Sequence, residues 1–192
     1  MSKYSILFLC LLIVAKSSAQ YGNLDPTFGN QGVVINESNA GFGNNIGQKL
    51  ALQPDGKIVV AAVLFGNFPA ELAVLRYLTD GTLDNTFGTG GIARIPEPAF
   101  ASTSALDIAI QADGKIVVVG SAAAVGEPFA DFSLARFLPG GQPDLSFGVM
   151  GIAIHRIFGY AYGSLPYAIA LQPDGKILLA GAKIDNMDFR IH

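Results

Sequence analysis

The sequence predicts an all-β protein made of three similar units, each folded as a small antiparallel sheet. Two short motifs recur in step along the 192 residues, with a period of about 60. Gln-x-Asp-Gly-Lys-Ile begins at Gln53, Gln111 and Gln172. Asp-x-Thr/Ser-Phe-Gly begins at Asp25, Asp84 and Asp144. A period of this length is typical of tandem-repeat architectures, in which each repeat is one structural unit.

The first motif predicts a hairpin turn in each unit. Pro54 presets φ at the first turn position, Asp55 favours the next one, and Gly56 accepts the positive φ that closes a tight turn. In the second copy Ala112 replaces the proline, which a type I turn tolerates. Apolar runs flank all three copies, so each turn is expected to join two strands.

Each unit is expected to contain four strands of about five residues in an antiparallel meander. Strand one follows the Phe-Gly motif, and strands two and three flank the Asp-Gly turn. Strand four is expected at 72–78 and at 132–138. In the last unit Phe189 takes the place of Phe132, so the sequence stops inside strand four. The approximate units are 24–82, 83–142 and 143–192.

The side chains predict that these sheets stack face to face. In strand two, Leu50 and Leu52 flank Ala51, so one face is bulky and the other is small. Strand three, at 58–62, is apolar on both faces, as expected for a sheet that is covered on both sides. Stacked small sheets of this kind are the blades of a β-propeller. A single β-sandwich is the alternative, but it would not explain the repeat.

Residues 1–19 have the composition of a secretory signal peptide. Lys3 supplies the positive start, residues 6–15 form an apolar core, and small residues precede a cut before Gln20. The core is shorter than the roughly 18–20 residues that span a bilayer, so an uncleaved anchor is the weaker alternative. We therefore expect an exported repeat domain at 20–192, either secreted or held at the cell surface or in the periplasm.

Composition argues against several kinds of partner and cofactor. Beyond Cys10 the chain has no cysteine, and without residues 1–19 it has 10 basic against 15 acidic residues. A mildly acidic, sparsely charged chain is a poor ligand for nucleic acid or anionic membranes. His155 and His192 are the only histidines, and the sequence offers them no triad or zinc partners. We expect no cofactor, and His155 is expected to be a solvated residue at a strand end.

The combination of these motifs resembles the delta-60 repeat family of secreted bacterial proteins. The resemblance runs from Leu24 to the last residue and rests on Leu-Asp-x-Thr-Phe-Gly, Gln-x-Asp-Gly-Lys-Ile and an apolar-Arg-aromatic strand. It implies tandem propeller-like blades and export. It implies no catalytic residues, so none is assigned. One departure is that three units are too few for a closed ring.

The repeated charged residues are interpreted as structural. Asp84 and Asp144 precede the Phe-Gly motif, and Arg76 and Arg136 recur on strand four. Identical residues in every unit serve the unit, so each arginine is expected to bind a carboxylate or turn carbonyls. A calcium site at 80–85 is the alternative, although the segment lacks the spacing of a calcium loop.

The loops divide into a constant and a variable set. In a meander, alternate connections lie on one edge, so the Asp-Gly turns and Phe-Gly connections should share an edge. The other edge carries loops that differ in every unit, and divergent loops on a rigid scaffold are how recognition surfaces are built. In one of these loops Phe158, Tyr160 and Tyr162 are the candidate ligand contacts, because they could stack on a sugar or a peptide. Packing within the loop is the alternative.

The leading functional hypothesis is a non-catalytic binding or scaffolding module that recognises a glycan or a protein. A lyase or hydrolase with its site on the variable loops is the first alternative. A structural spacer within a longer surface protein is the second. Because the last unit would leave an apolar face uncovered, we also expect either further C-terminal repeats or self-association.

Overall fold

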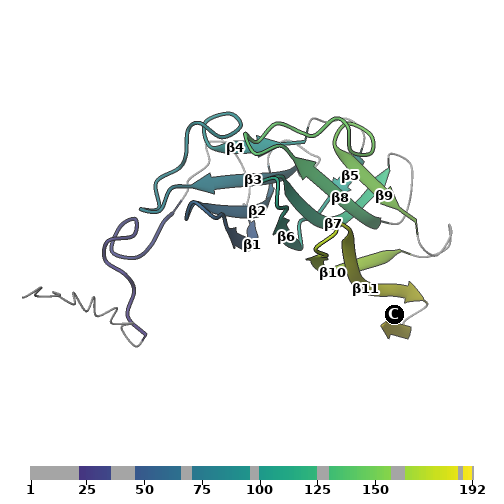
Figure 1. The fold of residues 1–192 in the computed structure, drawn as a ribbon. Helices are drawn as coiled ribbons and strands as arrows, with labels where there is room; N and C mark the ends of the chain where they lie inside the picture. The colour runs from purple at the N-terminus through teal and green to yellow at the C-terminus, as the bar shows by residue number, and fades with distance from the viewer. Residues whose placement is uncertain are drawn as a thin grey trace, which may run out of the picture.

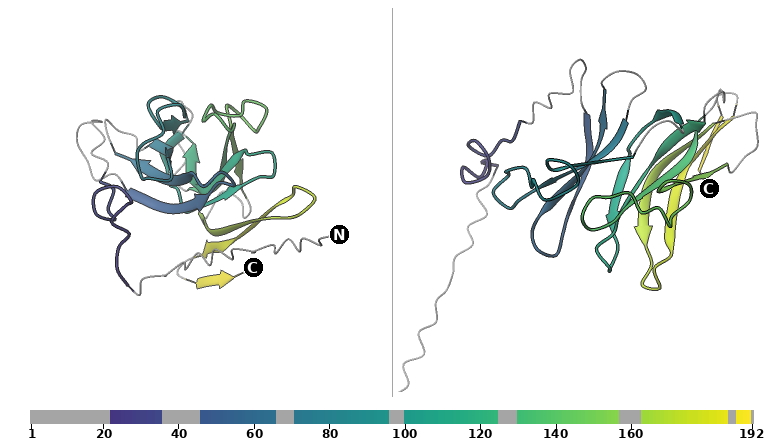
Figure 2. Two further views of the ribbon diagram at one scale, coloured as in Figure 1. Left: turned by 60° about the vertical axis from the view of Figure 1, so that its left-hand side comes forward. Right: turned by 90° about the horizontal axis from the view of Figure 1, so that it is seen from above.

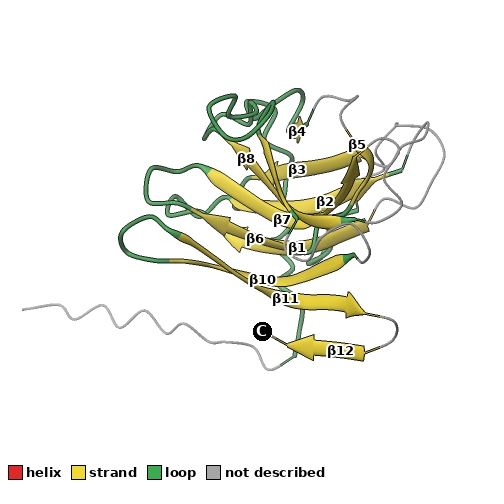
Figure 3. Cartoon of the chain, turned by 90° about the vertical axis from the view of Figure 1, so that its right-hand side faces the viewer, coloured by secondary structure: helices red, strands yellow, loops and turns green. Residues whose placement is uncertain are grey.

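The computed structural model describes residues 22–35, 46–65, 71–95, 100–124, 130–156, 163–185 and 188–191. All the regular secondary structure in these ranges is strand, so the predicted all-β class is confirmed (Figure 3). In the same ranges there is no helix that could cross a membrane. The predicted signal peptide, His192 and the candidate contacts Phe158, Tyr160 and Tyr162 lie outside the described residues.

The strands form three antiparallel sheets, which we name blades A, B and C (Figure 1). Blade A has the order β1 (Ile46–Leu52), β2 (Ile58–Leu64), β3 (Glu71–Tyr77) and β4 (Ile92–Arg94). Blade B contains β5 (Phe100–Thr103), β6 (Asp107–Ile110), β7 (Ile116–Ala124), β8 (Asp131–Phe137) and β9 (Ile152–His155). Blade C contains β10 (Ser164–Leu171), β11 (Ile177–Asp185) and β12 (Asp188–Ile191).

The inner strand of blade B is divided, which the sequence analysis did not predict. Both β5 and β6 pair with β7, on either side of a break at 104–106. The inner strands of the other blades carry an irregularity in their pairing at the corresponding place, between Gly47 and Lys49 in β1 and between Pro166 and Ala168 in β10. The break is therefore a stronger form of a bulge that all three blades share.

The grouping of strands into sheets also differs from the predicted meander. The strand after the Phe-Gly motif does not pair with the next strand of its own sequence unit. It returns instead to the preceding sheet, where β4 pairs with β3 in the register Ala73↔Arg94 and Leu75↔Ile92. A blade therefore consists of strands two, three and four of one unit and strand one of the next. The first copy of strand one, at 32–35, joins none of the described sheets, and Val33 bridges only to Asn30.

The hairpin turns have the predicted backbone conformation. The glycines of the three Asp-Gly pairs have φ of 82°, 80° and 85° at Gly56, Gly114 and Gly175. The preceding aspartates accept a hydrogen bond from the backbone N–H two residues on, as Asp55 does from Lys57 at 3.2 Å. The register of the last strand, in contrast, is not as predicted. Ile191, rather than Phe189, lies opposite Ala182, because the connection that precedes β12 is shorter than the one between β7 and β8.

The three sheets stack face to face in an open array, as Figure 2 shows in its right-hand view. Between blades A and B, side chains such as Val59 and Val74 pack with Ile116 and Phe137, all fully buried or nearly so. Between blades B and C, Val117 and its neighbours pack against residues of blade C, including Ile169, Ile177 and Leu179. Val59 and Val117, on strands predicted to be covered on both faces, are both 0% exposed. The array is an incomplete β-propeller.

Candidate functional site

A buried ion pair joins the third strand of blade A to the Phe-Gly connection. Arg76 Nε lies 2.9 Å from Asp84 Oδ2, and the two side chains are 9% and 4% exposed. Asp84 Oδ1 accepts two further hydrogen bonds, from the hydroxyl of Thr86 at 2.6 Å and from its N–H at 3.0 Å. The Arg76 guanidinium lies over the ring of Phe87, 4.4 Å from its centroid. The motif therefore fixes one arginine through its charge and its planar face.

Blade B repeats this arrangement with the equivalent residues. Arg136 Nε is 2.8 Å from Asp144 Oδ2, the Ser146 hydroxyl donates to Asp144 at 2.6 Å, and Arg136 lies 4.2 Å from the ring centroid of Phe147. The predicted structural pairing of arginine with carboxylate is thus present in both blades. In the first copy Asp25 binds Thr27 in the same way, at 2.7 Å from its hydroxyl.

These carboxylates are held in the ionised form. The hydrogen bond from the Thr86 hydroxyl is the largest cause that lowers the pKa of Asp84 to about 2, and the positive charges of Arg76 and Lys57 act in the same direction. The pKa of Asp144 is also lowered, first by the Ser146 hydroxyl. A carboxylate that stays ionised and saturated with donors is a poor proton donor, so the pair has a structural role.

Arg76 and the connection that holds it also bind the next blade. Arg76 donates through its terminal guanidinium nitrogen to the carbonyl of Pro139 in blade B at 2.8 Å. The N–H of Gly88 donates to the carbonyl of Gly140, also at 2.8 Å. A third bond between the blades crosses from B to C, where the N–H of Ile169 donates to Asp107 at 3.0 Å. These bonds add directional contacts between neighbouring sheets to the apolar packing.

The Asp-Gly turns and the Phe-Gly connections lie on one edge of the array, as predicted. Lys57, in the first turn, lies 3.5 Å from Asp84 in the connection. Each turn also pairs its own lysine with its own aspartate: Lys57 with Asp55, Lys115 with Asp113, and Lys176 with Asp174. The charged residues of this constant edge thus satisfy one another.

A second set of ion pairs, which was not predicted from the sequence, lies toward the opposite, variable edge. Glu71, at the start of β3, pairs with Arg94 at 2.6 Å. Asp131, at the start of β8, pairs with Arg156 at 2.9 Å and is itself buried. An acid at the start of the third strand of the blade and an arginine at the end of the fourth strand, or directly after it, could have indicated these pairs. The spacing of 23 residues in one blade and 25 in the other concealed the repeat.

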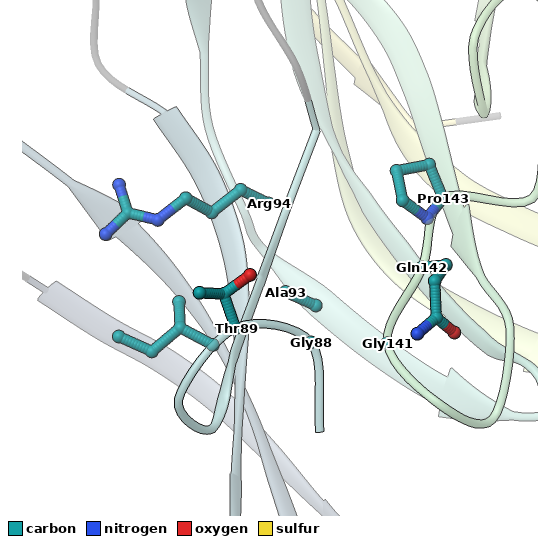
Figure 4. Close-up of a pocket in the computed structure, with 8 residues that line it drawn as sticks. Gly88, Thr89, Ala93, Arg94, Gly141, Gln142 and Pro143 are labelled. Carbon is teal, nitrogen blue, oxygen red and sulfur yellow. The ribbon is translucent and has the colours of Figure 1, made fainter. Parts of the chain in front are cut away.

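A cleft of about 300 Å³ lies between blades A and B (Figure 4). Gly88, Thr89 and β4 form one wall, and the segment 141–143 forms the other. The Arg94 side chain extends away from Gln142 (Figure 4), in keeping with its pairing to Glu71. The Thr89 hydroxyl and the Gln142 carboxamide are polar groups that could bind a small neutral ligand.

A second cleft, of about 370 Å³, lies between the turns of blades B and C. Its lining includes Gln111 and Gln172, which begin the repeated turns, together with Ile110 and Leu171. The side-chain oxygens of Gln111 and of its counterpart Gln53 are buried and accept no hydrogen bond from the described residues. Because Gln53 and Gln111 occupy the same place in their units, this feature belongs to the repeat and not to one specific site.

The described part of the chain contains no group of three or more potential metal ligands. In segment 80–85, the alternative calcium site, Asp80 accepts hydrogen bonds from Thr82 and Asp84 accepts one from Arg76, so both carboxylates already have protein partners. His155 ends β9 and is exposed, as predicted.

The stacked antiparallel sheets and the repeated connection define an open β-propeller. Comparison with known families agrees with this class. Residues 53–87 and 111–147 match a family model described as "Domain of unknown function (DUF5122) beta-propeller". Each match runs from the glutamine of the Asp-Gly turn to the phenylalanine of the Phe-Gly motif, so it spans the part of the repeat that contains the ion pair. No curated protein and no solved structure matches the chain.

Proposed function

We propose that this chain is an exported β-propeller module of the delta-60 repeat type, which binds or scaffolds a glycan or a protein without catalysing a reaction. Its ligand surface is the variable edge, which carries the loops that differ between the units. Phe158, Tyr160 and Tyr162 are the proposed contacts.

The contrast between the two edges is the observation that carries this proposal. On the constant edge the recurring charged residues pair within their own turn or with the adjacent connection, as Lys176 does with Asp174. Residues that repeat in every blade and satisfy one another maintain the scaffold. Residues that differ in every blade serve no common structural contact, and they are therefore available for recognition.

A non-catalytic role is supported by how the acidic side chains are used. Asp84, Asp131 and Asp144 are buried and paired with arginine. A general acid or base needs a group that can exchange its proton near neutral pH, whereas the pKa of Asp84 is about 2. An enzyme would have to draw its catalytic groups from the variable loops.

Glycan and peptide arrays probed with the full-length protein test the proposal. We expect retention on one class of probe and a loss of at least about tenfold in affinity for the Tyr160→Ala/Tyr162→Ala variant, as for removal of stacking aromatics. Lys176→Ala is the matched control, because Lys176 lies on the constant edge and pairs only with its own turn aspartate among the described residues.

Three outcomes would contradict the proposal. An equal loss of affinity in the Lys176→Ala control would place the ligand on the constant edge. Turnover of a bound probe would favour the lyase or hydrolase alternative. Absence of binding to every probe would favour a structural spacer.

A further inference from the structure

The two ends of the array expose side-chain positions that are buried in its middle. Leu178 occupies in blade C the position of Val59 in blade A and Val117 in blade B. The two valines are 0% exposed, but Leu178 is 50% exposed. Leu178 lies on the face of β11 opposite to Ile177 and Leu179, which pack against blade B. With exposed Ala168, Ala170 and Ala180, it forms what we call the C face.

The opposite end of the array exposes the complementary positions. Leu50 and Leu52 on β1 are 61% and 67% exposed, whereas Ile108, the counterpart of Leu50 in blade B, is 7% exposed. Leu50 and Leu52 lie opposite Val60 and Ile58 on β2, and Ala51 between them points to the core shared with blade B. We call this bulky surface the A face.

Within the chain the small face of one blade covers the bulky face of the next. Ala51 and Val59 of blade A share a core with Ile108 and Ile110 of blade B. Val117 of blade B shares one with Ile169 and Leu179 of blade C. The C face is a small face without a bulky neighbour among the described residues, and the A face is a bulky face without a small one.

The N-terminal segment 22–35 continues this pattern at the outer part of blade A. Gly29 N–H donates to the Asp80 carbonyl at 2.8 Å, as Gly88 does to Gly140 between blades A and B. By its motif and its contact, the segment is the connection and last strand of a blade whose first three strands are absent from the described residues. Blade C has three strands, and its outer edge is unpaired in the described part of the chain. The two ends are therefore complementary parts of one blade.

We propose that the chain associates head to tail, with the C face of one copy on the A face of a second copy and the segment 22–35 of the second copy beside blade C of the first. The contact repeats the A–B and B–C contacts, so its chemistry is already present twice in each molecule. Such a contact is heterologous, and two copies in a ring would supply six blades, within the range of four to eight that propellers use.

Sedimentation of the full-length protein and of two single variants tests the contact. We expect the unmodified protein to have twice the monomer mass. Leu178→Glu and Leu52→Glu should each weaken association by about a hundredfold or more, because a carboxylate would be buried without a partner. Leu145→Glu is the control, because Leu145 is 70% exposed and lies on the Phe-Gly connection between β8 and β9, not on the strands β1 and β11 that carry Leu52 and Leu178. A monomeric unmodified protein, or equal weakening by Leu145→Glu, would overturn the proposal.

Cross-linking distinguishes the head-to-tail arrangement from a symmetric one. In a Cys10→Ser background, Leu52→Cys and Leu178→Cys chains are mixed and treated with a bis-maleimide. Cross-links that form in the mixture and not in either chain alone support head-to-tail association. Cross-linking of Leu178→Cys alone would show that two C faces meet and would overturn the proposal. Folding of each variant is checked by circular dichroism before treatment.

Discussion

Replacement by methionine should destabilise the protein most at Arg76, less at Arg136 and least at Arg94. Methionine retains much of the apolar stem and removes the charge and its hydrogen bonds. Arg76 and Asp84 are 9% and 4% exposed, and Arg76 also donates to Pro139 of the next blade. Its loss leaves a buried carboxylate and a carbonyl short of a donor, which costs about 3–5 kcal/mol when a buried pair is broken. Lys57, 3.5 Å from Asp84, can compensate in part, so we expect about 3 kcal/mol.

Arg136 and Arg94 serve as comparisons, because their ion pairs are less buried than that of Arg76. Arg136 is 19% exposed and makes no bond to a neighbouring blade in the described residues, so we expect Arg136→Met to cost about 2 kcal/mol. Arg94 and Glu71 are 41% and 32% exposed, and a surface pair of this kind contributes at most about 1 kcal/mol.

Urea unfolding monitored by far-ultraviolet circular dichroism measures the three differences. Urea is chosen because guanidinium would screen the ion pairs. Protein concentration is held constant, since self-association would add to the apparent stability. If Arg94→Met lowered the free energy of unfolding as much as Arg76→Met, burial would not explain how much the Arg76–Asp84 pair stabilises the protein. The reasoning would then be refuted.

Two further predictions concern pH and backbone packing. The pKa of Asp84 is lowered to about 2 in the folded protein, so its contribution is complete above the ordinary carboxyl pKa near 4 and is lost as the pH falls toward 2. Urea midpoints should decline over that window, less so for Asp84→Asn, and an unchanged decline in the variant would contradict the assignment. Gly120→Ala should destabilise by about 3 kcal/mol or prevent folding, because its Cβ would overlap the Ser104 carbonyl oxygen. In Gly90→Ala the Cβ meets nothing within 4 Å, so only the positive φ destabilises the fold, by about 1 kcal/mol. Equal effects of the two glycine variants in thermal unfolding would refute the packing argument.

The strands, the turns and the stacking could be read from the sequence because each depends on residues close together in the chain. Pro54, Asp55 and Gly56 specify a turn by their own backbone preferences, and the alternation of Leu50, Ala51 and Leu52 specifies two faces by the geometry of a strand. The pairing of Arg76 with Asp84 could be inferred from their joint recurrence. These features need no knowledge of distant segments.

Which strands share a sheet does not follow from the sequence. The repeated sequence is the same whether β4 pairs within its own unit or with the sheet of the preceding unit. Only the observed pairing of Ala73 with Arg94 distinguishes these two arrangements. The break in the inner strand of blade B and the register of β12 also depend on loop length and bulges, to which hydrophobic patterns are insensitive.

By itself, then, the sequence determined an all-β repeat with turns, two-faced strands and an internal arginine–aspartate pair, because local conformational preferences and periodicity encode these. Only the tertiary structure decided that the first strand of one unit pairs with the blade formed by the preceding unit. The same holds for the hydrogen bond that the Pro139 carbonyl accepts from Arg76 of that preceding blade. The tertiary structure also decided which positions of the repeat are left exposed at the two ends. The physical reason is that burial and hydrogen bonding between blades depend on which blades are neighbours. The sequence of a repeat does not specify its neighbours, because it is nearly the same in every unit.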